Sequence, residues 1–375
     1  MTNGVHEKRI ETLRKGVAEL SEGRYDTSWI IQPENRRYLS GFRAEDSQLT
    51  ESSGSLLING VDRLLVTDSR YTLEAEREAV DFEVHTLKQG LTEDLPELLT
   101  RIGARNLGFE EDYLTWGIHR KITERLDGLS PPVYLLPSRG VVEQMREVKD
   151  EYELKALEDA ADLISEILDE VIVGLKPGMT EREVAWKVEG LARDAGAEAL
   201  SFPPVVASGP NSAFPHAVPT DRRLQMKESI ILDAGVRLKG YCSDITRTVF
   251  MGEPSPDLKA MYITVRQAQL SALDVIKPLV ESTLVDGVAR KIIGDAGFGG
   301  YFGHGLGHGV GLAVHERPRL GPKNPVKLKK GAVVTVEPGI YIPGTGGVRL
   351  EEMVAIEDSG PRILTKNNHF YDFGS

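Results

Sequence analysis

The stretch SIILDAGVRLKGYCSDITRTVFMG, residues 229–252, contains two alternating β-type segments joined by a turn near Leu238 to Gly240. Ten residues separate Asp233 from Asp244, which fits four strand residues, a two-residue turn and four more strand residues. In such an antiparallel hairpin we expect the two aspartates to sit opposite each other on one face. Carboxylates placed this way repel each other unless a cation lies between them. The stretch therefore predicts a hairpin and a cation site.

Helical patterns on both sides of the hairpin indicate an internal duplication. The short sequences Lys-Pro and Asp-Ala-Gly begin at Lys176 and Asp194 and again at Lys277 and Asp295, and 277 − 176 and 295 − 194 both equal 101. The helix before the first copy has an amphipathic stripe with steps of three and four residues, formed by Leu154, Leu157, Ala161, Ile164, Leu168 and Val171. Thr180 and Glu183 are spaced as a capping box at the start of the next helix.

The second copy is followed by another pair of β-type segments, GAVVTVEPGIYIPGTGGVRLEEMVAI, residues 331–356. Glu337 lies in the first segment, and Glu351 and Glu352 lie in the second. Each half of the duplication therefore supplies two carboxylates. Between the second copy and these segments, YFGHGLGHGVGLAVHE, residues 301–316, holds three of the eight histidines of the chain.

These side chains together form an oxygen-rich donor set with one imidazole, consisting of Asp233, Asp244, Glu337, Glu351 and a histidine of residues 301–316. Such a set suits Mn²⁺, Fe²⁺, Co²⁺ or Zn²⁺. Four carboxylates exceed the charge of one divalent ion, so we expect two ions that share bridging carboxylates. A two-metal site polarises a carbonyl and activates water near neutral pH.

The rest of the chain indicates a second, smaller domain. A length of 375 residues allows two hydrophobic cores. Residues 54–60 and 62–71 have strand patterns, and residues 72–80 and 93–103 have helical patterns. Apolar density falls around residues 139–160. We therefore expect an N-terminal α/β domain at residues 1–140 and a catalytic domain at residues 141–375.

Composition excludes several classes of partner. The formal net charge of −12, with basic residues scattered along the chain, argues against nucleic acid. No stretch reaches the ~18 apolar residues that a membrane span needs. Cys242 is the only cysteine, so no intrachain disulfide forms, and we expect a cytoplasmic protein.

Several motifs, in this order, closely resemble those of the proline-specific branch of the pita-bread metallopeptidases, which contains prolidase and Xaa-Pro aminopeptidase. They are DAGVRLKGYCSDITRTVF, GHGLGHGVGLAVHE, VEPGIY and GGVRLEEMVAI, with VVASGPNSAFPHA, NRRYLSGF and TDSRY upstream. The resemblance implies an α+β fold, a pita-bread catalytic domain with pseudo-twofold duplicated helices around a curved antiparallel sheet. It also implies a smaller N-terminal α/β domain of the creatinase type, which often helps to form a homodimer.

The resemblance also implies a role for each candidate residue. Asp233, Asp244, His308, Glu337 and Glu351 resemble the ligands of two divalent ions, with manganese expected first and cobalt, iron or zinc as alternatives. Asp244 and Glu351 would bridge the ions. His315 and His216 resemble the pair that contacts the substrate at the scissile carbonyl, and Glu337 is the candidate for moving a proton from water to the leaving nitrogen. The other positions expected to shape the substrate site are His304, Arg349 and Tyr241.

The implied activity is hydrolysis of the peptide bond before proline in short peptides. The sequence leaves open whether the substrate is a dipeptide or a longer peptide, and which residue precedes proline. Ala313 and Pro203-Pro204 depart from the family pattern and bear on specificity rather than on hydrolysis. The alternatives are a metal-free hydrolase like creatinase, a methionine aminopeptidase, and a noncatalytic binding module on the same fold. Metal analysis would separate the first and third from the implied enzyme.

Overall fold

The structure is a computed structural model that describes residues 4–20, 23–46, 48 and 51–373. The chain divides into two compact units, Met1–Arg146 and Glu147–Ser375. This division lies six residues beyond the expected one at 140/141 (146 − 140). Among the described residues no helix has the length and apolar character needed to cross a membrane.

The N-terminal unit is built on one six-stranded sheet with the order β4-β3-β2-β1-β5-β6. Only β2 runs antiparallel to the others. Its strands are β1 (Thr27–Ile30), β2 (Ser55–Ile58), β3 (Arg63–Thr67), β4 (Glu83–Thr86), β5 (Asn106–Phe109) and β6 (Tyr134–Pro137). Its helices are α1 (Val5–Leu20), α2 (Pro33–Ser40), α3 (Thr72–Glu78), α4 (Leu91–Arg101), α5 (Trp116–Leu126) and α6 (Val141–Glu147). The four elements expected at residues 54–103 correspond to β2, β3, α3 and α4.

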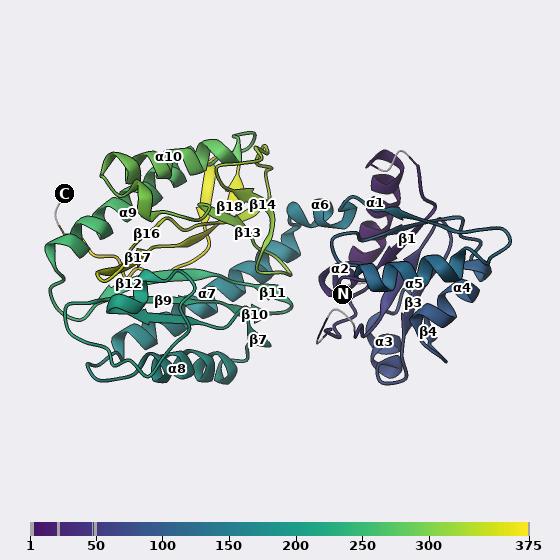
Figure 1. Cartoon of the computed structure of the whole chain (residues 1–375), viewed down its shortest axis with the longest axis horizontal. Coiled ribbons are helices and arrows are strands. Elements are labelled where there is room, and N and C mark those ends of the chain that lie inside the picture. Colours follow the sequence, from purple (N-terminus) through teal and green to yellow (C-terminus); the bar gives the residue numbers. More distant parts are fainter. Residues whose placement is uncertain (1–3, 21–22, 47, 49–50, 374–375) are drawn as a thin grey trace. The chain divides into compact units, whose positions relative to one another are not determined.

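Two antiparallel helix pairs form the outside of the C-terminal unit, with the strands between them (Figure 1). The helices are α7 (Glu151–Val173), α8 (Glu181–Asp194), α9 (Pro256–Val275) and α10 (Ser282–Asp295). The second helix of each pair begins and ends at positions 101 residues apart (282 − 181, 295 − 194). Each pair packs on a separate apolar core. The capping box predicted at Thr180 and Glu183 is present, and the duplication predicted from sequence is present in the helices.

The strands of this unit repeat as well, because each helix pair is followed by strands of one half. The first half contains β7 (Ala199–Leu200), β8 (Val205–Ser208), the 3-10 turn η1 (Gly209–Ala213), β9 (Ser229–Ala234), β10 (Val236–Leu238), β11 (Tyr241–Cys242) and β12 (Ile245–Phe250). The second half contains η2 (Gly299–Tyr301), β13 (Gly307–Gly309), β14 (Glu316–Leu320), β15 (Val333–Val336), β16 (Gly339–Ile342), β17 (Gly346–Arg349), β18 (Glu352–Glu357) and β19 (Gly360–Ile363). The halves meet where the Glu351 N–H donates to the Thr246 carbonyl at 3.1 Å.

The register of the first hairpin differs from the prediction. Asp233 pairs with Thr246, whereas we expected it to lie directly opposite Asp244. The reason is the turn: Leu238 pairs with Tyr241, so the two turn residues are Lys239 and Gly240, with φ of 53° and 86°. Positive φ at both positions is the geometry of a type I′ turn, which matches the strand twist. The turn lies one residue later than expected, so the pairing shifts by two and both aspartates stay on one face.

Candidate metal centre

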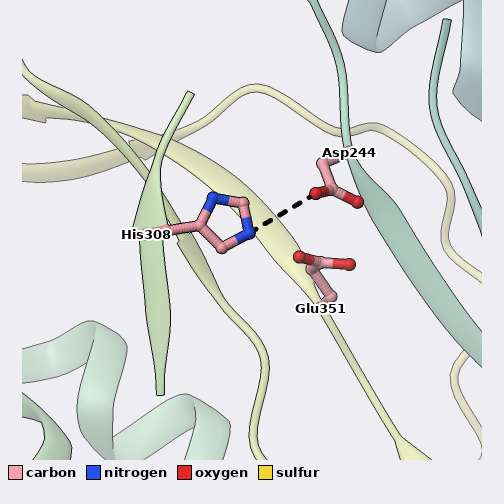
Figure 2. Close-up of side chains that lie close together, drawn as sticks. All are labelled: Asp244, His308 and Glu351. Carbon is pink, nitrogen blue, oxygen red and sulfur yellow. Dashed lines mark ion pairs between the residues drawn. The ribbon is translucent and has the colours of Figure 1, made fainter. Parts of the chain in front are cut away.

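Three side chains from distant parts of the chain converge in the C-terminal unit. One ligating atom from each of Asp244, His308 and Glu351 lies within 4.8 Å of the other two. Figure 2 shows the His308 ring pointing between the two carboxylates, with His308 Nε2 3.6 Å from Asp244 Oδ2. Asp244 comes from the first half of the duplication and Glu351 from the second. Both halves are therefore needed to build the cluster.

The remaining two predicted ligands lie beside this cluster. Glu337 Oε1 is 3.5 Å from His308 Nε2. Asp233 Oδ2 accepts a hydrogen bond from Arg349 Nη2 at 2.5 Å, and Asp233 Oδ1 is buried without a hydrogen-bond partner among the described residues. The structure thus brings His308 close to three carboxylates, while the fourth is paired with an arginine.

Local backbone geometry fixes the His308 ring. The carbonyl of Gly309 lies 3.1 Å from His308 Nδ1 and can only accept, so Nδ1 carries the proton and Nε2 is left as the donor to a metal. The His308 N–H donates to Thr335 Oγ1 at 3.1 Å. A Cβ atom at Gly307 would lie 2.1 Å from the Thr335 carbonyl oxygen, so the strand can approach β15 this closely only with glycine there.

Asp244, Glu337 and Glu351 are buried close together, and this raises their pKa values. Burial, together with the charges of Glu351, Asp233 and Glu337, raises the pKa of Asp244 well above its usual range. Burial and the charge of Asp233 raise the pKa of Glu351 to about 8. The pKa of Glu337 is also raised, by burial and by the Glu351 charge. Burial lowers the pKa of His308 to about 4, so its imidazole is neutral at pH 7.

These observations fit a divalent cation. The carboxylates are repelled by one another, His308 offers an unprotonated nitrogen, and Asp233 Oδ1 is a buried acceptor without a partner. A hard cation would remove the repulsion and satisfy these acceptors. The donor set therefore has the chemistry of a metal site. Oxygen and one imidazole nitrogen favour a first-row divalent ion over copper(I).

A second network joins Arg349, Tyr341 and His304 next to the cluster. Arg349 Nη1 donates to the Tyr341 hydroxyl at 2.8 Å, and that hydroxyl lies 3.0 Å from His304 Nε2. The Gly305 carbonyl accepts from His304 Nδ1 at 2.8 Å, so Nε2 accepts from Tyr341. His304 therefore lies in this network and not in the group around Asp244. Arg349 also donates to Thr246 Oγ1, which itself donates to Glu351 Oε2.

The two histidines expected to face substrate are both exposed. The His315 ring stands edge-on to His308, with ring centroids 4.3 Å apart. His216 lies in the segment after η1, close enough for its charge to lower the pKa of His304 and of His315, after the larger effect of burial. The residue after His315, Glu316, accepts from the Ala313 N–H at 2.9 Å and forms a buried ion pair with Lys149. That pair holds the loop carrying His315.

Tyr341 is a functional candidate that the sequence analysis did not single out, although it ends the quoted motif VEPGIY. Tyr241, which was expected to help shape the substrate site, donates its hydroxyl to Glu153 Oε1 of α7 at 3.1 Å. In the described contacts the tyrosine bonded to Arg349 is Tyr341. Sequence spacing cannot choose between them, because β16 and β17 bring Tyr341 beside Arg349 only through their pairing.

Comparisons with known proteins agree across nearly the whole chain. The profile of metallopeptidase family M24 matches residues 155–358, and that of the creatinase/prolidase N-terminal domain matches residues 9–148. A Xaa-Pro dipeptidase of Pyrococcus horikoshii is 34% identical over 95% of this chain and 97% of its own length.

Two solved structures extend the agreement to the fold. A Xaa-Pro dipeptidase from Bacillus anthracis has a TM-score of 0.89 at 35% identity and covers 96% of this chain and 98% of its own. An X-Pro aminopeptidase from Thermotoga maritima has a TM-score of 0.81 at 37% identity and covers 91% and 96%. The expected architecture, a duplicated catalytic domain with a smaller N-terminal domain, is confirmed.

Proposed function

The chain belongs to metallopeptidase family M24, and from this membership we propose that it hydrolyses the peptide bond before proline in short peptides. The observation that carries the proposal is the group of Asp244, His308 and Glu351, with Glu337 beside it, in the matched region. In a noncatalytic module, buried acids that repel one another would lower stability without contributing to function. The relatives bear the names of both dipeptidases and aminopeptidases, so either substrate length is compatible with this assignment.

We propose that Asp233, Asp244, His308, Glu337 and Glu351 would hold two divalent ions. When bound, the ions supply Lewis acidity toward the scissile carbonyl and toward a water molecule. Manganese is our first choice, because four carboxylates form a hard donor set. Cobalt, iron and zinc are the alternatives.

The protein side chains then have distinct tasks. Glu337, whose pKa is raised by burial, is suited to accept a proton from water and pass it to the leaving nitrogen. His315 and His216 are exposed near the cluster and can donate hydrogen bonds to the substrate carbonyl. Arg349 is held by Tyr341 and Asp233, so its charge stays beside the carboxylates. His304 orients the Tyr341 hydroxyl.

We also infer a cytoplasmic homodimer. Cys242 is the only cysteine, and it is a buried free thiol, which suits a reducing compartment. The dimer rests on the resemblance of the N-terminal domain to its family. Light scattering of the purified chain gives its mass directly, and a mass near 41 kDa would reject the dimer.

One assay tests the activity. Purified protein is chelated, dialysed and supplied with Mn²⁺, and the release of free alanine is measured from Ala-Pro, Ala-Pro-Ala and the control Ala-Ala. We expect cleavage of a proline substrate only with metal, and no cleavage of Ala-Ala. Cleavage of Ala-Pro alone identifies a dipeptidase, and cleavage of the tripeptide identifies an aminopeptidase. Full activity after chelation, or no activity with any of the four metals, contradicts the proposal.

A further inference from the structure

The N-terminal unit contains a cavity that the metal centre does not explain. It has a volume of about 600 Å³ and is lined by residues from β1, β2 and β3, by the loop between β4 and α4, and by α5. Because β1, β3 and β4 run parallel, the ends of these strands that line the cavity are their carboxyl ends. In open α/β sheets that edge is where ligands bind, and the volume suits a small molecule.

Two residues that line the cavity each carry a buried polar atom without a partner among the described residues. Trp29 on β1 and Ser55 on β2 are 0% and 1% exposed, and neither the Trp29 Nε1 nor the Ser55 Oγ has a hydrogen-bond partner among the described residues. Both residues line the cavity. They share one face of the sheet, since Trp29 pairs with Leu57, two residues beyond Ser55. Burying a donor without a partner is unfavourable, so such groups usually mark a missing partner.

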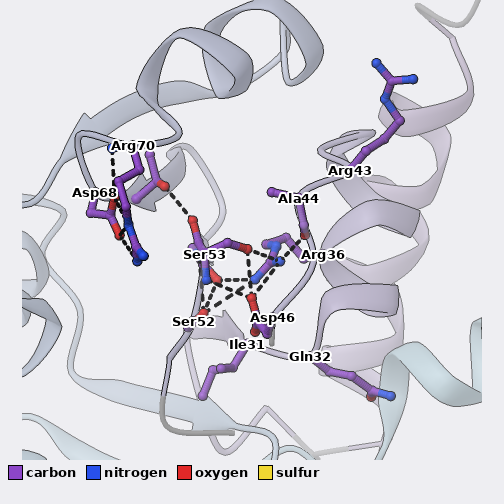
Figure 3. Close-up of polar contacts among 12 residues, drawn as sticks. Ile31, Gln32, Arg36, Arg43, Ala44, Asp46, Ser52, Ser53, Asp68 and Arg70 are labelled. Carbon is purple, nitrogen blue, oxygen red and sulfur yellow. Dashed lines mark hydrogen bonds and ion pairs between the residues drawn. The ribbon is translucent and has the colours of Figure 1, made fainter. Parts of the chain in front are cut away.

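The wall next to Ser55 is rigidly held. Arg36, fully buried, donates to the carbonyls of Ala44 and Gly54 and to the hydroxyl of Ser53, and pairs with Asp46 (Figure 3). This arginine fixes the segment that enters β2. A site whose walls are already ordered loses little entropy on binding.

The rest of the lining mixes apolar, polar and charged side chains, and its charged members include Glu51, Lys88, Glu93 and Lys121. Leu87, Leu91, Leu114 and Ile118 supply apolar surface. Asp68 and Arg70, at the end of β3, neutralise each other at 2.8 Å (Figure 3). Helix α4 begins at the cavity with Gly90 as its N-cap, which offers no side-chain oxygen to the helix amides. The cavity thus combines buried hydrogen-bond donors, an apolar surface and charged side chains of both signs.

We propose that this cavity binds a small molecule that has an apolar body and ends in a carbonyl or carboxylate oxygen. The oxygen accepts hydrogen bonds from the Trp29 indole N–H and the Ser55 hydroxyl, and the apolar body packs on Leu87, Leu114 and Ile118. An indole N–H can only donate, so the group facing it is an acceptor. The proposal is independent of the peptidase assignment.

The experiment follows the three indole N–H signals of protein labelled with ¹⁵N-tryptophan, one each for Trp29, Trp116 and Trp186. Benzoate, benzamide and benzyl alcohol are titrated to millimolar concentration as probes. We expect the Trp29 signal, assigned by its loss in Trp29→Phe, to shift downfield with benzoate or benzamide and to respond several-fold more weakly to benzyl alcohol. Trp186, on α8 of the C-terminal unit and 65% exposed, is the internal control and should not move. Tighter binding of benzoate indicates a carboxylate ligand, and tighter binding of benzamide indicates a ligand with a neutral carbonyl.

Ser55→Ala is the second variant, and it removes only a hydroxyl that has no partner, so the fold should persist. We expect it to weaken binding of the better probe by roughly three- to tenfold, the usual contribution of one hydrogen bond. The proposal is overturned by a Trp29 signal that ignores all three probes. It is also overturned by equal shifts with benzyl alcohol, or by unchanged affinity in Ser55→Ala. Metal content and peptidase activity are measured on the same samples, so that failure here is not confused with failure of the metal centre.

Discussion

The three histidines of residues 301–316 face three different kinds of partner. His308 Nε2 faces Asp244 and Glu337, His304 Nε2 accepts from Tyr341, and His315 is exposed at the edge of the His308 ring. Of the three, His308 has a nitrogen within 4 Å of carboxylate oxygens, those of Asp244 and Glu337. These different surroundings predict different consequences when each ring is removed.

His308→Ala should lose metal together with activity, because it removes the only nitrogen donor of the proposed site. His315→Ala and His216→Ala should keep the metal and lose roughly 10²–10³ in kcat, the usual effect of removing a donor to an oxyanion. Metal analysis and kcat on the same preparations separate the two outcomes, with His369→Ala as the control histidine. Metal lost from His315→Ala but kept by His308→Ala would refute the assignment.

Tyr341→Phe and Tyr241→Phe form a matched pair of variants. They test which tyrosine hydroxyl positions Arg349. The first removes the hydroxyl shared by Arg349 and His304, and the second removes a hydroxyl bonded to Glu153. We expect Tyr341→Phe to lower kcat/KM by roughly 10- to 100-fold with unchanged metal content, since one charged hydrogen bond contributes about 1.5–3 kcal/mol. A larger loss in Tyr241→Phe would assign the role to Tyr241.

At the scale of elements, the loop that carries His216 depends on one buried carboxylate. Glu181, the first residue of α8, is fully buried. It accepts hydrogen bonds from the N–H and hydroxyl of Ser208 and of Thr220, and from the Asn211 amide. Residues 208 and 220 bracket the segment containing His216. A helix N-terminus therefore anchors the loop that carries His216.

Glu181→Gln should destabilise the protein by about 2–4 kcal/mol, because an amide replaces an acceptor of several hydrogen bonds. It should also lower kcat/KM at temperatures where the protein stays folded, with the metal content unchanged. Glu183→Gln, the same substitution two residues later on the exposed face, is the control and should cost only about 1 kcal/mol. Equal kcat/KM in the two variants would limit Glu181 to a purely structural role.

Elements with a strong local signal were predicted well, and those that depend on pairing were not. The capping box at Thr180 and the helices that follow each copy of Lys-Pro are encoded by nearby residues. The hairpin register was wrong, because it depends on which two residues accept positive φ. The side chain of Lys239 gives no indication that this residue adopts a positive φ. Gly240 alone does not specify whether it is the first or the second turn residue. A one-residue difference in the turn moved the partner of Asp233 from Asp244 to Thr246.

At the scale of the whole molecule, the duplication and the two-domain organisation could be predicted because they repeat or change composition over many residues. The cavity of the N-terminal unit could not, since its lining comes from several strands and helices whose order in the sheet is not encoded locally. Tyr341 was missed for the same reason. The sequence alone does not show which distant segments pair with each other.

The chelated protein should become less stable as pH rises from about 5 to about 8. The pKa of Glu351 is raised in the folded state from 4.5 to about 8, so across this window the folded state binds more protons than the unfolded state. Stability then falls as pH increases. Asp244 and Glu337 act in the same direction. Thermal melting in chelator at several pH values measures this slope.

Glu351→Gln should flatten the slope in chelator, because glutamine does not titrate. Added metal should raise the melting temperature most at the high end of the window, where the carboxylates are ionised and can serve as ligands. A chelated protein that gains stability between pH 5 and 8 would contradict the raised pKa of the cluster.

The two halves of the C-terminal unit are alike in their pairing but not in their chemistry. Ser208 pairs with Ile230 and Gly309 pairs with Val334, and each of those partners lies three residues before a carboxylate, Asp233 or Glu337. Ala207 is therefore the counterpart of His308, and the twofold symmetry is broken at the one nitrogen ligand. The two ions that we propose would occupy inequivalent positions. Their removal by chelator should accordingly be biphasic, with one ion exchanging before the other.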